Sequence, residues 1–270
     1  MYDYGWRQYM PDVARWMQLD PLVEDTEDPY SYVYNNPIRF IDPDGKQNKD
    51  VIITGRAADA ALNELQKAVS SELTLTKDNN GKVSYKQNNS SGKLSADAQQ
   101  LVNAIDDHSV NVNVKAENTK ITEAENLYIG GAFSGNKTRN LLSRDGSSMS
   151  AITETEQEVN PKVLGAMSDY FGKPGTDMLH EVTESYQGGI IARKLGHNAG
   201  PPSEMDGDNP FSVYNRAHYG ATPQTTDGVQ ANFFDQNGNP TNILTKTGRA
   251  EFIITDSTNV KAPLIIQTYP

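Results

Sequence analysis

The clearest candidates for chemistry lie close together in the stretch HEVTE, residues 180–184. On a helix, His180 and Glu184 stand four residues apart and therefore lie on the same side, one turn from each other. An imidazole and a carboxylate at that spacing can bind one zinc ion, because zinc accepts both nitrogen and oxygen ligands. Glu181 follows the first ligand directly and is placed to act as a general base on water. The pattern therefore indicates a metal site with a hydrolytic residue beside it.

A helix must present these side chains. One apolar face has residues three or four positions apart, namely Leu179, Val182, Tyr186 and Ile190. Thr176 or Asp177 can cap the start of the helix, and Gly196 is a natural end after two basic residues. The spacing predicts a helix over about 177–195. On such a helix the polar residues can alternatively form an ordinary solvated face, with no metal bound.

A catalytic zinc site uses three protein ligands, so a third must come from elsewhere in the chain. The sequence has four histidines and no cysteine, which excludes thiolate ligands, disulfides and cysteine nucleophiles. His218 is the preferred candidate because it lies in a predicted short helix over 211–219, and a ligand from a second element is the common catalytic pattern. His197, just past the end of the first helix, is the alternative. Tyr219 or Tyr214 can polarise a substrate carbonyl.

The pentapeptide at 180–184 resembles the H-E-x-x-H signature of zincin-like metallopeptidases, with glutamate in place of the second histidine. The resemblance covers these five residues alone. It implies a zinc-dependent hydrolase, most specifically a metallopeptidase, that acts on a protein or peptide substrate. Glu181 would be the catalytic residue, and the metal ligands would be His180, Glu184 and His218.

The first 46 residues differ from the rest, since they hold both tryptophans, six of the 13 tyrosines and repeated Asp-Pro pairs. Such a composition predicts short strands and tight turns. The pieces YDYG-x-R-x-Y-x-P, RW…DP, DPYSYVYNNP and IDPDG resemble the end of the RHS/YD-repeat-associated core domain. That resemblance implies a remnant of a large β-shell, followed by a variable C-terminal domain that is often a toxin. It also associates Asp20 and Asp42 with self-cleavage, although Lys46 stands where the family usually has leucine and no glycine follows Pro21.

The rest of the chain is predicted to be α+β, in two parts. Residues 47–116 predict the order β-α-β-β-α-β, which is similar to a ferredoxin-like arrangement. Residues 117–270 are predicted to form a mixed helical and loop-rich region with the candidate metal site. Within it, 151–160 is predicted to be an edge strand. The segment 198–242 is rich in Gly, Pro, Asn and Asp, and such long irregular segments often surround a site.

Composition excludes several functional classes. With 35 acidic and 24 basic residues, the net charge is −11 and no basic stripe is present, which argues against a nuclease or other nucleic-acid partner. No G-x-S-x-G motif supports a serine hydrolase. No apolar run of 18 residues predicts a transmembrane helix, and the N-terminal residues do not have the pattern of a signal peptide.

Two functions are compatible with these features. The first is the effector or toxin region of an RHS-type protein, acting as a zinc-dependent hydrolase. It would be secreted or delivered by a bacterial export system within a larger RHS protein, and an immunity protein would be a further partner. The alternative is a non-catalytic binding or structural module attached to an RHS core. The distance between His218 and the pair His180 and Glu184 discriminates between them.

Overall fold

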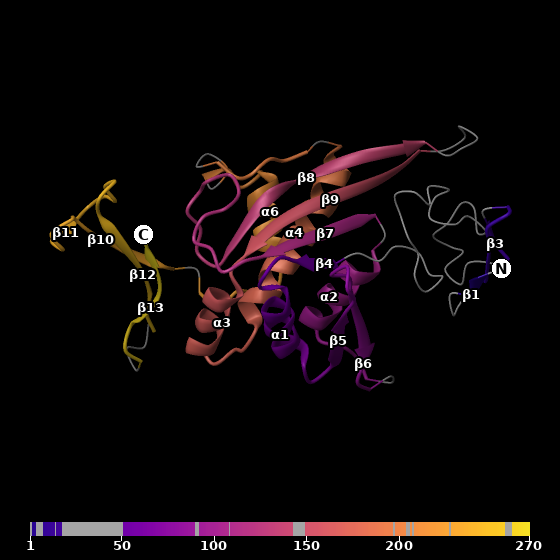
Figure 1. The fold of residues 1–270 in the computed structure, drawn as a ribbon, viewed down its shortest axis with the longest axis horizontal. Helices are drawn as coiled ribbons and strands as arrows, with labels where there is room; N and C mark the ends of the chain where they lie inside the picture. Colours follow the sequence, from indigo (N-terminus) through magenta and orange to yellow (C-terminus); the bar gives the residue numbers. More distant parts are fainter. Residues whose placement is uncertain are drawn as a thin grey trace. The chain divides into compact units, whose positions relative to one another are not determined.

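The computed structural model divides into two compact units, residues 1–49 and residues 50–270. The described residues are 2–3, 8–13, 15–17, 51–89, 92–107, 109–142, 149–196, 198–203, 206, 208–226, 228–256 and 261–270. Both units are coloured along the sequence in Figure 1.

The first unit contains a small antiparallel sheet of three short strands: β1 (Tyr2–Asp3), β2 (Gln8–Met10) and β3 (Arg15–Trp16). Trp16 is 2% exposed. The prediction of short strands and turns is therefore confirmed for these residues. The aspartates of the expected self-cleavage, Asp20 and Asp42, lie outside the described residues, as does Lys46.

The second unit is built on a four-stranded mixed sheet with the order β4-β7-β9-β8. Its strands are β4 (Val51–Thr54), β7 (Val110–Ala116), β9 (Met149–Val159) and β8 (Gly131–Leu142). The first three run parallel to one another, and β8 lies antiparallel to β9 at the edge. In β7 every second residue is buried, which is the alternation expected of a strand with one covered face. The predicted α+β class is confirmed.

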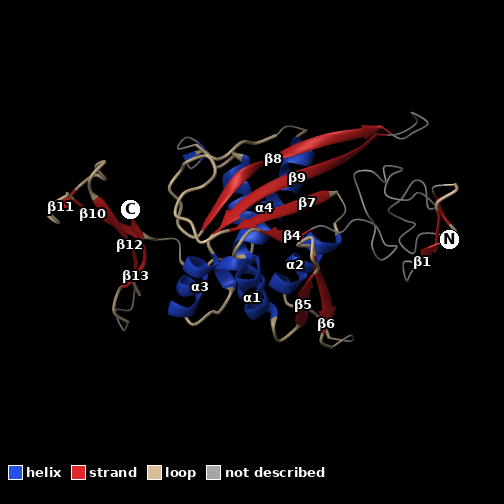
Figure 2. Cartoon of the chain, in the orientation of Figure 1, coloured by secondary structure: helices blue, strands red, loops and turns tan. Residues whose placement is uncertain are grey.

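Helices pack against one face of this sheet and enclose a continuous apolar core. They are α1 (Ala58–Val69), α2 (Ala96–Asp106) and α4 (Thr176–Leu195). Figure 2 shows α4 running behind the strands. The shorter α3 (Pro161–Tyr170) links β9 to α4 and is capped by the side chain of Asn160. This path brings the candidate site on α4 against the parallel sheet.

The predicted β-α-β-β-α-β order is present in residues 51–116, but its strands do not form one ferredoxin-like sheet. The inner strands β5 (Leu73–Lys77) and β6 (Val83–Gln87) form a separate hairpin, while β4 pairs directly with β7. The side chain of Gln66 on α1 satisfies backbone groups of β5, because it donates to the carbonyl of Leu73 and accepts from the N–H of Leu75. Helix α1 thus supports the hairpin from one side, while the N–H of Ile53 on β4 donates to the carbonyl of Gly81 in its turn at 2.8 Å.

The prediction of an edge strand at 151–160 is wrong, because β9 is internal and β8 occupies the edge. The inward residues of β9 are Thr153, Thr155 and Gln157, all almost completely buried. Because these buried side chains are polar, the sequence of β9 lacks the apolar residues by which an internal strand is normally recognised. The inward side of β9 therefore presents polar groups to α4.

The predicted helix over 177–195 is confirmed as α4, but neither Thr176 nor Asp177 caps it. Its N-cap is Gly175, which makes no side-chain cap hydrogen bond, and its C-cap is Gly196 in the left-handed conformation. A Cβ atom added at Gly189 would lie 2.4 Å from a methyl group of Val110, so this glycine permits close contact between helix and sheet. Both sides of α4 are consequently buried.

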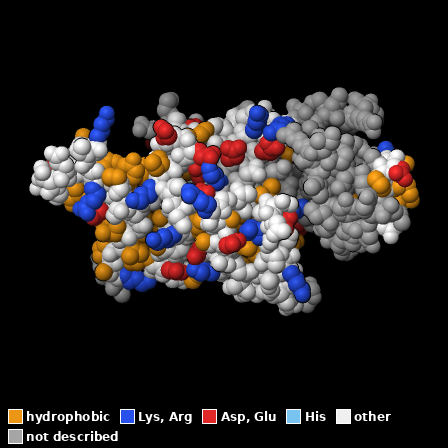
Figure 3. Space-filling view, in the orientation of Figure 1, with side chains coloured by type: hydrophobic (Ala, Val, Ile, Leu, Met, Phe, Trp, Pro, Cys, Tyr) orange, Lys and Arg blue, Asp and Glu red, His pale blue; other side chains and the backbone are white. Residues whose placement is uncertain are grey.

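The last strands form a four-stranded antiparallel sheet with the order β11-β10-β12-β13. Its strands are β10 (Gln230–Phe234), β11 (Pro240–Thr241), β12 (Arg249–Ile254) and β13 (Leu264–Tyr269). Ile254 packs with Val163 and Met167 of α3. Apolar side chains gather over this region in Figure 3, and Ile243 and Ile265 are exposed. Among the described residues, no helix is long and apolar enough to cross a membrane.

Candidate metal centre

Three ionisable side chains from two helices meet at one point. His180 and Glu184 come from α4, and His218 comes from α6 (Val213–Gly220). Nε2 of His180 lies 3.2 Å from Nδ1 of His218, which lies 3.2 Å from Oε1 of Glu184. All three candidate ligand atoms lie within 4.8 Å of one another. A tetrahedral zinc ion with bonds of about 2.0–2.1 Å separates its ligand atoms by roughly 3.4 Å, so these atoms are spaced for one ion.

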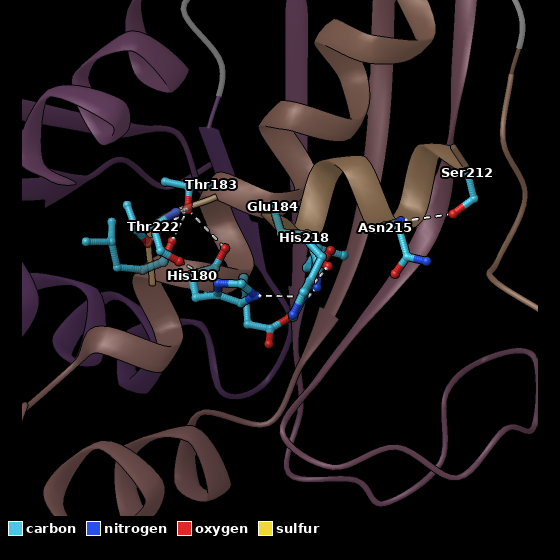
Figure 4. Close-up of polar contacts among 10 residues, drawn as sticks. His180, Thr183, Glu184, Ser212, Asn215, His218 and Thr222 are labelled. Carbon is cyan, nitrogen blue, oxygen red and sulfur yellow. Dashed lines mark hydrogen bonds and ion pairs between the residues drawn. The ribbon is translucent and has the colours of Figure 1, made fainter. Parts of the chain in front are cut away.

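Local hydrogen bonds fix the start of α6, and an apolar contact brings this helix to α4. The hydroxyl of Ser212 accepts from the N–H of Asn215 at 3.0 Å, as an N-cap should, and donates to the carbonyl of Asp206 at 3.0 Å. On the next turn, Ala217 is fully buried and packs with Ile191 of α4. This contact directs His218 toward the ligands on α4, and the two imidazoles point toward each other in Figure 4. The predicted short helix is confirmed.

The tautomer of His180 is set by the backbone. Nδ1 of His180 lies 2.6 Å from the carbonyl oxygen of Thr222, so Nδ1 carries the proton and Nε2 keeps a free lone pair. Thr222 is held in turn by Thr183, because its N–H donates to the Thr183 hydroxyl at 3.1 Å and the two hydroxyls lie 3.0 Å apart. Both threonines are buried. The protein alone therefore fixes the orientation of the His180 ring.

Burial lowers the pKa of His180, although hydrogen bonding to the Thr222 carbonyl and the nearby Glu184 carboxylate partly oppose this shift. A lowered pKa keeps the imidazole neutral at physiological pH. Neutral imidazole is the form that binds a metal ion. The electrostatic environment of His180 therefore suits a ligand.

Glu181 lines the same cavity as the three candidate ligands and is 9% exposed. Nε2 of Gln157, on β9, donates a hydrogen bond to its carboxylate. Burial raises the pKa of Glu181 well above its ordinary value, and the negative charge of Glu184 raises it further. A carboxyl group with a raised pKa is the kind that serves in proton transfer near neutral pH.

The cluster opens into a cavity of about 860 Å³, a size typical of ligand-binding sites. His180, Glu181, Glu184 and His218 line it, together with parts of β8 and the segment 122–129. Tyr214 also lines the cavity, whereas Tyr219 does not line it and is 82% exposed. Burial raises the pKa of Tyr214 to about 12, so its hydroxyl stays protonated and can donate a hydrogen bond.

Three of the predicted site residues, His180, Glu184 and His218, lie together in the structure. The structure brings His218 to the pair on α4, while His197 lies outside the described residues. His180 is 3% and Glu184 is 4% exposed, so these two side chains do not form a solvated face of the helix, and metal binding stays a prediction. Sequence reasoning missed the groups that hold the site in place. They are Gly131, Gln157, Thr183 and Thr222.

Comparison with known proteins gives short partial matches. The chain is 46% identical over 46 residues to salivary gland surface protein 1 of Aedes aegypti, covering 17% of this chain and 1% of that protein. It is also 46% identical over 46 residues to the toxin subunit YenC2 of Yersinia entomophaga, covering 17% of this chain and 5% of that subunit. The chain thus spans a small fraction of either relative. No family model and no solved structure matches it.

Proposed function

We propose that residues 50–270 form a zinc-dependent hydrolase, most specifically a metallopeptidase. One observation carries this proposal: nitrogen and oxygen atoms of His180, Glu184 and His218 converge within 4.8 Å at the wall of a large cavity. Two nitrogens and one carboxylate oxygen are a donor set that suits zinc. A fourth position toward the cavity is left for water or substrate.

The residues of the site have distinct roles in such a reaction. When bound, zinc supplies a Lewis acid and lowers the pKa of the attacking water. Glu181 accepts a proton from that water as its oxygen attacks the carbonyl carbon, and passes the proton to the leaving amine when the C–N bond breaks. Tyr214 remains protonated, so its hydroxyl can donate to the oxygen of the tetrahedral intermediate.

Burial of the cluster supports a bound cation over a non-catalytic module. The carboxylates of Glu181 and Glu184 are both buried, and the negative charge of Glu184 adds to the effect of burial in raising the pKa of Glu181. Burying such groups without a compensating charge costs free energy. A dication between the ligands removes that cost. A structural module has no need for this arrangement.

We further propose that this hydrolase is the effector region of a larger RHS-type protein. The resemblance of residues 1–46 to the end of an RHS core supports this, as does the partial match to a toxin subunit. In this setting the chain would be exported with its RHS core. Its partners would be a protein or peptide substrate and an immunity protein.

Metal content and hydrolysis together test the proposed enzyme. Purified protein should contain about one zinc per chain by mass spectrometry, and His180→Ala should contain none. Glu181→Gln should retain the zinc and lose peptide hydrolysis, because it keeps the shape of the side chain and removes the base. A wild-type chain without stoichiometric metal, or full hydrolysis by Glu181→Gln, would overturn the proposal.

A further inference from the structure

The catalytic carboxylate of Glu181 lies between α4 and the edge of the main sheet. Two positions on the sheet contact it: Gly131 at the start of the edge strand β8, and Gln157 on the neighbouring internal strand β9. They are close to each other, since Gly131 pairs with Val159 and Phe133 pairs with Gln157 across the two strands. We call Gly131 and Gln157 the carboxylate seat.

Gly131 leaves space that Glu181 fills. A Cβ atom added at Gly131 would lie 1.9 Å from both Cδ and Oε2 of Glu181, and 2.2 Å from Oε1. The backbone at Gly131 does not require glycine, because its φ lies outside the left-handed region, unlike that of Gly130 at +83°. The three atoms nearest to such a Cβ all belong to the carboxyl group of Glu181. Glycine at this position is explained by Glu181.

Gln157 has a matching explanation. It is 1% exposed and its Nε2 donates to Oε2 of Glu181, while its Oε1 has no hydrogen-bond partner among the described residues. A buried amide with an unsatisfied oxygen costs free energy that an apolar residue would avoid. Thr155, on the same face of β9, is by contrast satisfied by the hydroxyl of Ser185 at 2.7 Å. The hydrogen bond to Glu181 therefore explains why a glutamine occupies this buried position.

We propose that Gly131 and Gln157 are positioning residues that fix the carboxylate of Glu181 beside the three candidate ligands. Gly131 sets how closely the carboxylate approaches the sheet, and Gln157 holds one of its oxygens. Neither residue belongs to the ligand set. The catalytic consequence rests on the proposed function, whereas the contact between Gly131 and Glu181 does not.

A double-mutant cycle on metal-free protein tests the contact without any activity. Gly131→Ala forces the carboxyl group off Gln157 and should lower the melting temperature by about 2–12 °C, because the buried Gln157 amide then loses its partner at a cost of about 1–3 kcal/mol. In a Glu181→Ala background the same substitution should have little effect, because the obstructing group is gone. An equal loss in both backgrounds would overturn the proposal. Gly228→Ala, which adds a methyl group into open space, is the matched control.

Kinetics test the positioning role. Gly131→Ala and Gln157→Leu should each keep one zinc per chain and lower kcat by about 100-fold with little change in KM, because a misplacement of about 1 Å can cost that much. Combining Gly131→Ala with Glu181→Asp should restore part of the lost kcat, since the shorter side chain leaves space for the methyl group. Loss of zinc, or no rescue, would contradict a positioning role. If wild type shows no hydrolysis, the proposed function fails, and the double-mutant cycle still decides the contact.

Discussion

Zinc should stabilise this chain measurably, and the stabilisation should depend on His218. The ligands of α4 are buried and His180 is already oriented by Thr222, so binding needs little rearrangement. A ligand that binds only the folded state at 100 times its Kd adds about 2.7 kcal/mol to the free energy of unfolding. For a domain of this size, each kcal/mol shifts the melting temperature by about 2–4 °C. The expected rise is therefore roughly 5–11 °C.

Thermal unfolding by circular dichroism is a suitable assay, with chelated protein compared before and after zinc addition. His218→Ala removes the ligand from α6 and should abolish the rise. Tyr219→Ala is the control, because Tyr219 follows His218 in the sequence but its side chain is 82% exposed and does not line the cavity. It should keep the full rise. Equal zinc shifts in wild type and His218→Ala would refute the assignment of the third ligand.

Three further predictions address the residues around the ligands. Thr183→Val removes the hydroxyl that holds Thr222, and should weaken zinc affinity by about 10-fold or more in a chelator competition; unchanged affinity would show that the Thr222 carbonyl needs no such support. Tyr214→Phe should lower kcat by about 100-fold without changing metal content, whereas equal kcat values would remove Tyr214 from the reaction. The raised pKa of Glu181 means that the folded, metal-free chain binds a proton more tightly than the unfolded chain, so its stability falls as pH rises from the unfolded value through the folded one. Glu181→Gln should therefore gain melting temperature over wild type at pH 7 and not at pH 4, and a pH-independent difference would contradict this.

Local signals predicted the helix that carries the ligands. The apolar spacing and the glycine at its end are contained within a few turns, so α4 was located to within about a residue at each end. The same holds for the short helix with His218, which begins at the Ser212 cap. The types and spacing of these residues also predict zinc binding, which stays a prediction.

Tertiary contacts determined what the sequence could not predict. The approach of His218 to α4 depends on the packing of Ala217 on Ile191. These two residues lie 26 positions apart in the sequence, so no local pattern predicts their contact. The inward side of β9 is polar because Thr155 and Gln157 bond to α4, so the strand lacked the apolar pattern of a central position. Gly131 follows another glycine, Gly130, and nothing in the sequence connects it with Glu181. Its role becomes visible only when Glu181 lies against it.

A crystal structure of the zinc-bound chain, with anomalous scattering at the zinc edge, tests the central claim most directly. The predicted result is one peak at about 2.0–2.2 Å from Nε2 of His180, Oε1 of Glu184 and Nδ1 of His218, open to the cavity. A peak bound by other residues, or none at these three side chains, would contradict the assigned metal centre.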